Sequence, residues 1–230
     1  MKHSSLSRAA ALVMSLLLLA LTVSAASGCG TKMQETSEGV KISGEEDKVF
    51  RHASVVYEPV EMGQKYGKLQ VSKSMVLKVW SIEGLSPEEW LTTEDGDVLY
   101  ADGVHLPTLT EMEPVSVQVC AYQTSVHVLR RVSDPALVSS LVTAWETAEG
   151  APYLNQSPLR SFKLRFESEE YPSLYYSVLY LEYGSDLVSG DVNYGRYFLY
   201  SAFDSRFVPV DGGLHDVFNF EDATGTEQAD

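Results

Sequence analysis

The sequence predicts an α+β fold, in which a mainly antiparallel β-sheet carries one amphipathic helix packed on a face. Three observations indicate this class. Alternating apolar and polar residues dominate the chain after residue 48, and such runs are typical of half-buried strands. Only one long segment has strong helical spacing and end signals. Strands and helices do not alternate regularly, as they would in a parallel α/β sheet.

The clearest strand pattern lies in residues 162–166. Phe162, Leu164 and Phe166 share one side of this segment, and Lys163 and Arg165 share the other, because successive side chains of a strand point to opposite faces. We therefore expect a sheet with one face against the core and one face toward water.

The predicted helix begins after Asp134. Asp134 is a typical N-cap, Pro135 suits the first helical position, and Gly150 stands just past the expected end. The apolar residues between them recur at helical spacing, which indicates a helix that lies on the sheet.

The first 28 residues have the order of a secretory signal. Lys2 and Arg8 precede an apolar run from Ala9 to Val23, and small residues follow. The run is shorter than the roughly 20 residues that span a bilayer as a helix, so a retained transmembrane anchor is the weaker alternative.

The segment Ala26-Ser27-Gly28-Cys29 resembles the lipobox of bacterial lipoproteins. This resemblance implies that Cys29 receives lipid and that the signal, residues 1–28, is removed. The chain would then be held on the outer face of the cytoplasmic membrane by its acyl chains. The alternative is an ordinary secretory signal, which would leave Cys29 as a plain thiol.

Composition predicts the rest of the organisation. Residues 29–48 have few large apolar side chains and are predicted to be a lipidated Cys followed by a flexible tether. Residues 49–220 have the length of a single α+β domain, and residues 221–230 form a predicted disordered acidic tail.

Loss of residues 1–28 leaves 15 basic against 32 acidic side chains, a net charge of −17. Such a field makes nucleic acid and anionic lipid headgroups poor partners. The simplest reason for the charge is the solubility of an exported protein.

Order and local sequence in the C-terminal half resemble the YhfM-like domain of some Gram-positive lipoproteins. The residues that carry this resemblance are Val132-Ser133-Asp134, at the start of the helix, and Leu179-Tyr180-Leu181 within a later strand. The family has no defined biochemical function, so the resemblance implies location and architecture and no ligand.

No catalytic, metal-binding or cofactor-binding motif is recognisable in the sequence. His52, His105, His127 and His215 lack the spacing of a zinc site, and no nucleophile elbow or phosphate-binding glycine loop is present. Cys120 is predicted to be a packed residue rather than a nucleophile. We therefore expect no cofactor and no metal.

Tyrosine is concentrated between residues 171 and 200. Parity along residues 175–183 places Tyr176 and Tyr180 on the side that carries Glu182, and Tyr175 and Tyr183 on the side without a charge. The second set is predicted to face the core. Tyr176 and Tyr180 are therefore the candidate binding surface for a protein, peptide or glycan, with packing as the alternative.

The sequence favours a lipid-anchored extracytoplasmic binding or interaction module without catalytic activity. One alternative is an extracytoplasmic enzyme, such as a cell-wall or glycan hydrolase, whose site is assembled from distant His and acidic residues. A third is an accessory or sensor subunit of a membrane complex. A cavity that joins two histidines with a buried carboxylate would favour the enzyme.

Overall fold

The computed structural model describes residues 31–121, 127–152, 156–202 and 205–211. These residues form two compact units, one built from residues 31–52 and 61–104 and the other from residues 53–60 and 105–211. Each unit has its own core. The prediction of a single domain over residues 49–220 is therefore wrong. The predicted signal, Cys29 and the acidic tail over 221–230 lie outside the described residues.

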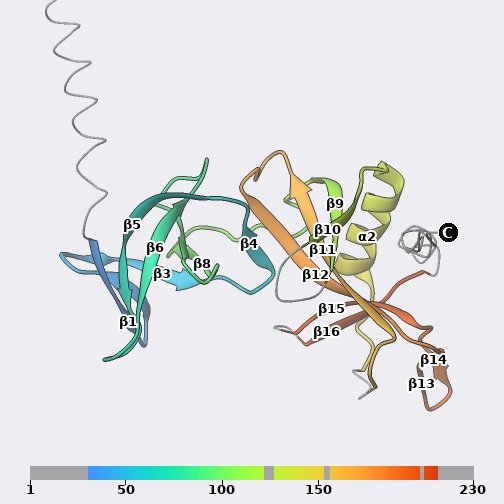
Figure 1. Ribbon diagram of the computed structural model, residues 1–230. Helices are drawn as coiled ribbons and strands as arrows, with labels where there is room; N and C mark the ends of the chain where they lie inside the picture. The colour runs from blue at the N-terminus through green and yellow to red at the C-terminus, as the bar shows by residue number, and fades with distance from the viewer. Residues whose placement is uncertain (1–30, 122–126, 153–155, 203–204, 212–230) are drawn as a thin grey trace, which may run out of the picture. The chain divides into compact units, whose positions relative to one another are not determined.

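The N-terminal unit is a closed seven-stranded barrel with the strand order β1-β2-β3-β8-β7-β6-β5 (Figure 1). Its strands are β1 (Thr31–Thr36), β2 (Gly39–Ile42), β3 (Glu45–His52), β5 (Met62–Gln70), β6 (Val76–Ile82), β7 (Trp90–Thr93) and β8 (Val98–Ala101). The sequence predicts a plain sheet, and the barrel corrects that prediction within a broadly confirmed α+β class.

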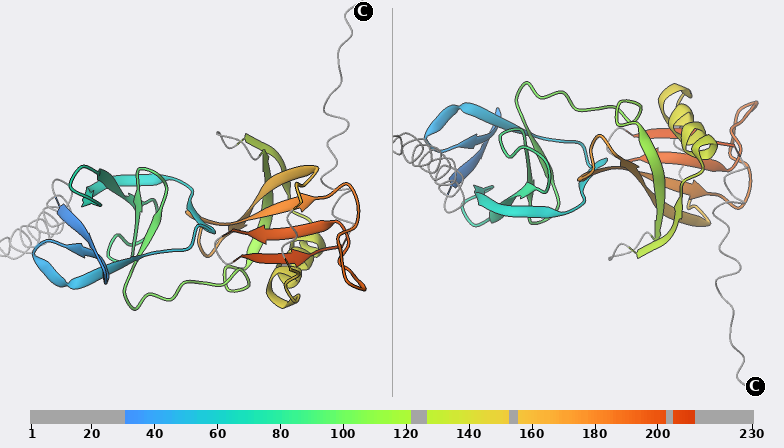
Figure 2. Two further views of the ribbon diagram at one scale, coloured as in Figure 1. Left: turned by 90° about the horizontal axis from the view of Figure 1, so that it is seen from below. Right: turned by 90° about the horizontal axis from the view of Figure 1, so that it is seen from above.

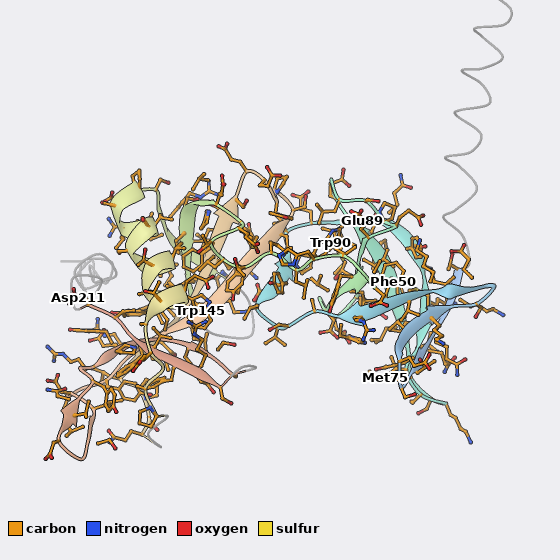
Figure 3. The ribbon with its side chains drawn as sticks, turned by 180° about the vertical axis from the view of Figure 1, so that it is seen from behind. Phe50, Met75, Glu89, Trp90, Trp145 and Asp211 are labelled. Atoms are coloured by element: carbon orange, nitrogen blue, oxygen red, sulfur yellow. The ribbon has the colours of Figure 1, made fainter. Side chains whose placement is uncertain are left out.

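Residues 31–48 form β1, β2 and the first half of β3. The prediction of a flexible tether over 29–48 is therefore wrong for residues 31–48, the part of that range that the structure describes. Met33, Val40 and Ile42 alternate with polar residues and lie buried in the barrel. Phe50, which is labelled in Figure 3, is buried in the same cluster. Their outward neighbours are polar because that side of a barrel strand meets water. Sparse apolar residues are thus enough for a strand in a small barrel.

Closure of the barrel depends on a close approach at Gly67. β1 pairs with β5 in parallel, and Thr31 lies opposite Gly67. A Cβ atom on residue 67 would lie 2.3 Å from the backbone oxygen of Thr31, which is far inside van der Waals contact. The absence of a side chain at Gly67 therefore lets the first strand close the barrel.

The C-terminal unit is a twisted antiparallel sheet with one helix on a face (Figures 1 and 2). The strands run in the order β10-β9-β11-β12-β15-β16, and β4 also pairs with β12. Their bounds are β4 Tyr57–Pro59, β9 Pro114–Ala121, β10 His127–Val132, β11 Arg160–Ser168, β12 Leu174–Glu182, β15 Tyr197–Ser201 and β16 Arg206–Pro209. A small hairpin, β13 (Val188–Ser189) and β14 (Val192–Asn193), precedes β15.

The predicted helix is confirmed as α2 (Pro135–Thr147). The side chain of Asp134 accepts a hydrogen bond from the backbone N–H of Ala136, and Pro135 occupies the first turn. Trp145 belongs to α2 and is buried on the side of the helix that faces the sheet (Figure 3). Its indole N–H donates to the hydroxyl of Tyr176 at 3.0 Å. No helix within the described part of the chain is long and apolar enough to cross a membrane.

The packing of β12 differs from the prediction. Tyr176 and Tyr180 lie on the side of the sheet that α2 covers, and both are buried. Tyr180 is fully buried and stacks on Phe162 and on Tyr197, with ring centroids 6.4 Å apart in each pair, and burial raises the pKa of its phenol. The second face is also packed, because Tyr183 is buried among Phe198 and Phe207. The prediction took Glu182 to mark the solvent-exposed face of β12, although Glu182 is buried.

Tyr180→Ala is expected to lower the free energy of unfolding by about 3–5 kcal/mol, because it removes a fully buried ring from a stacked set. Tyr180→Phe keeps the ring and provides the matched variant. Val128→Ala, on an exposed position of β10, should change stability by less than about 0.5 kcal/mol. Denaturant unfolding measures all three, and a cost of Tyr180→Ala near that of Val128→Ala would contradict the packing described here.

Candidate functional site

The sheet face opposite α2 carries an unusual set of charged and polar side chains. On β11, Leu164 and Phe166 point toward the helix side, so Lys163, Arg165 and Glu167 point to the other side, as the sequence pattern predicts. The register brings Gln118 of β9 and Ser177 of β12 opposite Arg165 on this same face. We call this side of the sheet the polar face.

Glu58, from β4, lies between two cations of the polar face. Its carboxylate accepts a hydrogen bond from the Lys163 ammonium at 2.5 Å and from the Arg165 guanidinium Nε at 2.7 Å. All three side chains are at most about a quarter exposed. Ion-assisted hydrogen bonds of this kind are short and stronger than neutral ones. They join residues more than 100 positions apart in the sequence.

Glu167 forms the centre of a second cluster on the same face. It accepts hydrogen bonds from Ser116, Gln118 and Arg131. The Gln118 amide also donates to the Tyr175 hydroxyl at 3.2 Å, and the Arg165 guanidinium lies 5.1 Å from the centre of the Tyr175 ring. The charges of this second cluster are paired within it, because the Glu167 carboxylate is bonded to the Arg131 guanidinium.

A cavity of about 170 Å³ opens next to Glu58 and Lys163. It lies where the edge of β12 changes partner: β4 pairs with Leu174–Tyr176, and β15 pairs with Leu179–Glu182. Between them, Ser177 and Val178 have no partner strand on that side. The residues that line the cavity are Val55, Val56, Glu58, Lys163, Ser177, Val178, Leu179, Tyr200, Ser201 and Ala202. We call it the strand-junction cavity.

Two residues of the cavity lining carry buried hydroxyls that have no partner among the described residues. The Oγ atoms of Ser177 and Ser201 have no hydrogen bond to any described residue, although the two residues are only 6% and 4% exposed. A buried polar group without a partner costs about 1–3 kcal/mol, so most such groups are paired with protein or with water. Ser177 lies opposite Arg165 on the polar face, whereas Ser201 lies opposite Arg206, whose guanidinium is over Trp145, and therefore points to the side that α2 covers. The partly buried charges of Lys163 and Glu58 in the lining make this cavity the candidate site.

A larger cleft, of about 550 Å³, is lined by residues of the barrel unit, among them Thr31, Lys65, Tyr66 and several acidic residues. None of the buried, unpaired polar atoms found among the described residues belongs to its lining. The Glu88 carboxylate in it is already paired with Lys48. This cleft therefore offers a weaker basis for recognition than the strand-junction cavity.

The residues singled out from the sequence lie elsewhere. Tyr176 and Tyr180, the predicted binding surface, are buried under α2 and present no contact surface. Cys29 lies outside the described residues. Cys120 is buried, and desolvation raises the pKa of its thiol, which disfavours the reactive thiolate.

The histidines do not gather at a site in the described parts of the chain. His52 lies 3.6 Å from Glu35 in the barrel unit, and His105 lies 2.9 Å from Glu111 in the C-terminal unit. His127 is exposed on β10. His215 lies outside the described residues. Among the described residues, no group of three or more His, Cys, Asp or Glu side chains is placed to hold a metal ion.

Sequence reasoning missed Glu58 as a site residue and gave no sign of the buried hydroxyls of Ser177 and Ser201. The two cations of residues 162–166 were visible as an outward-facing pair. Their partner could not be read from the sequence, because it comes from a three-residue strand that precedes them by more than 100 positions. The hydroxyls carry no sequence signal, since serine is common in exposed strands and turns.

Comparison of the chain with family models, with characterised proteins and with solved structures finds no match.

Ser177→Ala is expected to leave the free energy of unfolding unchanged or to raise it by up to about 1 kcal/mol, because it removes a buried hydroxyl that has no partner among the described residues. Ser168 is the matched control: it is also buried, but its hydroxyl accepts a hydrogen bond from the Tyr171 N–H at 3.0 Å. Ser168→Ala should cost about 1–2 kcal/mol, because that N–H loses its partner. Chemical denaturation compares the two, and a larger loss for Ser177→Ala would show that its hydroxyl is paired.

Proposed function

We propose that this chain is a lipid-anchored extracytoplasmic binding protein whose C-terminal unit holds a small polar ligand in the strand-junction cavity. One observation carries the binding part of this proposal: the partly buried ion pair of Lys163 and Glu58 lines a cavity at the junction of β4, β12 and β15. The Lys163 ammonium has three N–H donors and one hydrogen bond within the described residues, so a polar ligand that accepts from it would use donors that the described residues leave unused. The lipobox-like segment that ends at Cys29 supports the anchoring part.

The ligand that this cavity favours is smaller than the one that the tyrosines suggested. An exposed row of aromatic rings would suit a glycan or a peptide. Because Tyr176 and Tyr180 are buried, that surface is absent from β12. A cavity of about 170 Å³ is below the roughly 300–1,000 Å³ of sites for drug-sized ligands. We therefore infer a compact ligand that is held by polar contacts.

The alternative of an enzyme receives no support from the site. His52 and His105 each have one acidic neighbour, but they belong to different units. Neither residue lines the strand-junction cavity. A general base within reach of a bound substrate is the first requirement of acid–base catalysis. The carboxylate in the lining, that of Glu58, is held in hydrogen bonds by Lys163 and Arg165.

The anchoring part of the proposal requires the lipid to be attached close to the barrel unit in the sequence. If Cys29 is acylated, only Gly30 separates it from the first residue of β1, Thr31. The link is therefore at most about 7 Å of extended chain, in place of the long tether that composition suggested. The barrel unit, and no flexible spacer, lies between the lipid and the binding cavity in the sequence.

Cys29→Ser is expected to abolish lipid attachment and to leave both units folded, because residue 29 precedes every described strand. Fractionation of cells followed by a carbonate wash should recover the wild-type chain with membranes and the variant in the soluble fraction. Cys120→Ser is the control for loss of a thiol and should stay with the membranes. Retention of Cys29→Ser in the membrane fraction would contradict a lipid anchor at this residue.

Binding in the cavity is tested with a set of small polar compounds, screened by ligand-observed NMR against the purified full chain. We expect binders whose NMR signals change on addition of the wild-type chain and do not change on addition of Ser177→Leu, because the larger side chain on the polar face fills space beside Lys163. Ser74→Leu, in an exposed turn of the barrel unit, makes the same change away from the site and should preserve binding. Circular dichroism checks that each variant is folded. If no compound distinguishes the wild type from a folded cavity variant, the proposal fails.

A further inference from the structure

We propose that the outer face of β1, β5 and β6 is a membrane-contact surface that binds the phosphate headgroups of anionic phospholipids. We call this surface the lysine face, and its residues are Lys32, Gln34, Lys68, Gln70, Val76 and Lys78. The inference concerns the barrel unit alone and goes beyond the proposed function, because its test needs neither the strand-junction cavity nor Cys29.

The strand register sets three lysines side by side on the outside of the barrel. Lys32 of β1 lies opposite Lys68 of β5, and Lys68 lies opposite Lys78 of β6. All three are exposed, whereas Met33 and Leu69, the next residues along β1 and β5, are buried in the barrel core. Neighbouring strands are about 4.8 Å apart, so the row spans about 10 Å.

The stability of the barrel does not account for this row. Like charges on directly opposed residues of neighbouring strands are destabilising. Within the described residues Lys78 is paired with Glu94, and neither Lys32 nor Lys68 has an ion pair. The three lysines and Glu94 therefore place a net charge of +2 on a small area of surface, and such a surface attracts an anionic partner.

The acidity of the whole chain does not cancel this local charge. The net charge of −17 after loss of residues 1–28 made anionic lipid a poor partner by composition. Exposed charges are screened over about 10 Å at 0.1 M salt, so a headgroup in contact with the row responds to the lysines more than to distant carboxylates. Each lysine close to an anionic membrane strengthens binding by roughly fivefold.

Apolar side chains at one end of the lysine face favour a membrane over a soluble polyanion. Val76 lies opposite Gln70, two residues along β5 from Lys68. Met75, labelled in Figure 3, precedes Val76 in the hairpin that joins β5 to β6. Both apolar side chains are nearly half exposed. Surfaces that lie on membranes combine lysines with apolar side chains, because the apolar groups enter the acyl boundary while the ammonium groups stay among the headgroups.

The place of β1 in the chain supports the same partner. β1 is the first strand after Cys29. If Cys29 is acylated, the short link to Thr31 holds the start of β1 close to the bilayer, and Lys32 is the next residue. A soluble polyanion gives no reason for the row to begin at this position.

Vesicle co-sedimentation tests this proposal with residues 30–230, which contain every described strand and the helix and lack the predicted signal. We expect binding to vesicles that contain phosphatidylglycerol, weaker binding as salt is raised, and little binding to phosphatidylcholine alone. Lys32→Gln/Lys68→Gln should weaken binding by on the order of twentyfold. Met75→Ser should weaken it by a smaller factor that depends little on salt.

Arg130→Gln/Arg196→Gln is the matched control. It removes the same charge from exposed positions of the C-terminal unit and should bind like the parent chain. Circular dichroism checks that each variant is folded, and the lysine variant is expected to be at least as stable as the parent because it relieves repulsion between opposed strands. If the double lysine variant does not fold, Lys68→Gln decides alone.

Three results would overturn the proposal. One is equal binding, or no binding, to neutral and anionic vesicles. Another is an equal loss in the lysine and arginine variants. The third is tighter binding of soluble polyphosphate than of anionic vesicles at equal phosphate concentration, because the lysines would then serve a soluble polyanion. All three leave the small-ligand cavity and the anchor at Cys29 to their own experiments.

Discussion

The shared edge of β12 is the constraint on which the site depends. One strand edge is completed by two short partners, β4 at its beginning and β15 at its end. Backbone groups of a buried strand need partners along the whole edge. Between the stretches of β12 that pair with β4 and with β15, the N–H of Ser177 donates to the carbonyl of Val56 at 2.6 Å. The backbone is therefore paired across the junction, while the side chains leave a cavity there.

The same constraint couples the two halves of the sequence. β4 lies between β3 and β5 in the chain, both of which belong to the barrel unit. The C-terminal sheet thus takes one strand and the carboxylate of Glu58 from the N-terminal half. Neither unit is a continuous piece of chain, and a cut before residue 105 would remove Glu58 from its two cations. Lys163 and Arg165 would then be half-buried without a counter-charge, which is costly.

The sequence predicted local features well and long-range ones poorly. The cap at Asp134 and the alternation in residues 162–166 are confirmed, because both depend on neighbours within a few positions. The barrel was missed because Met33, Val40 and Ile42 are isolated among polar residues, a composition that linkers share. The face of β12 was assigned wrongly because one charge, Glu182, was taken to mark solvent, although that residue is buried.

Candidate sites are harder to predict than strands, because they depend on which strands become neighbours. The polar face brings together β4, β9, β11 and β12, whose order in the sheet differs from their order in the chain. Tyrosine concentration pointed to the same strand, β12, but to the opposite side, where Trp145 and Phe162 cover the rings. Aromatic rings gather where a small sheet needs apolar volume, whereas Lys163 and Arg165 reach their shared partner Glu58 because β4 joins the sheet beside β12. The outward-facing cations of residues 162–166 are therefore a better guide to the polar face than the tyrosines, because packing under α2 already explains why Tyr176 and Tyr180 are there.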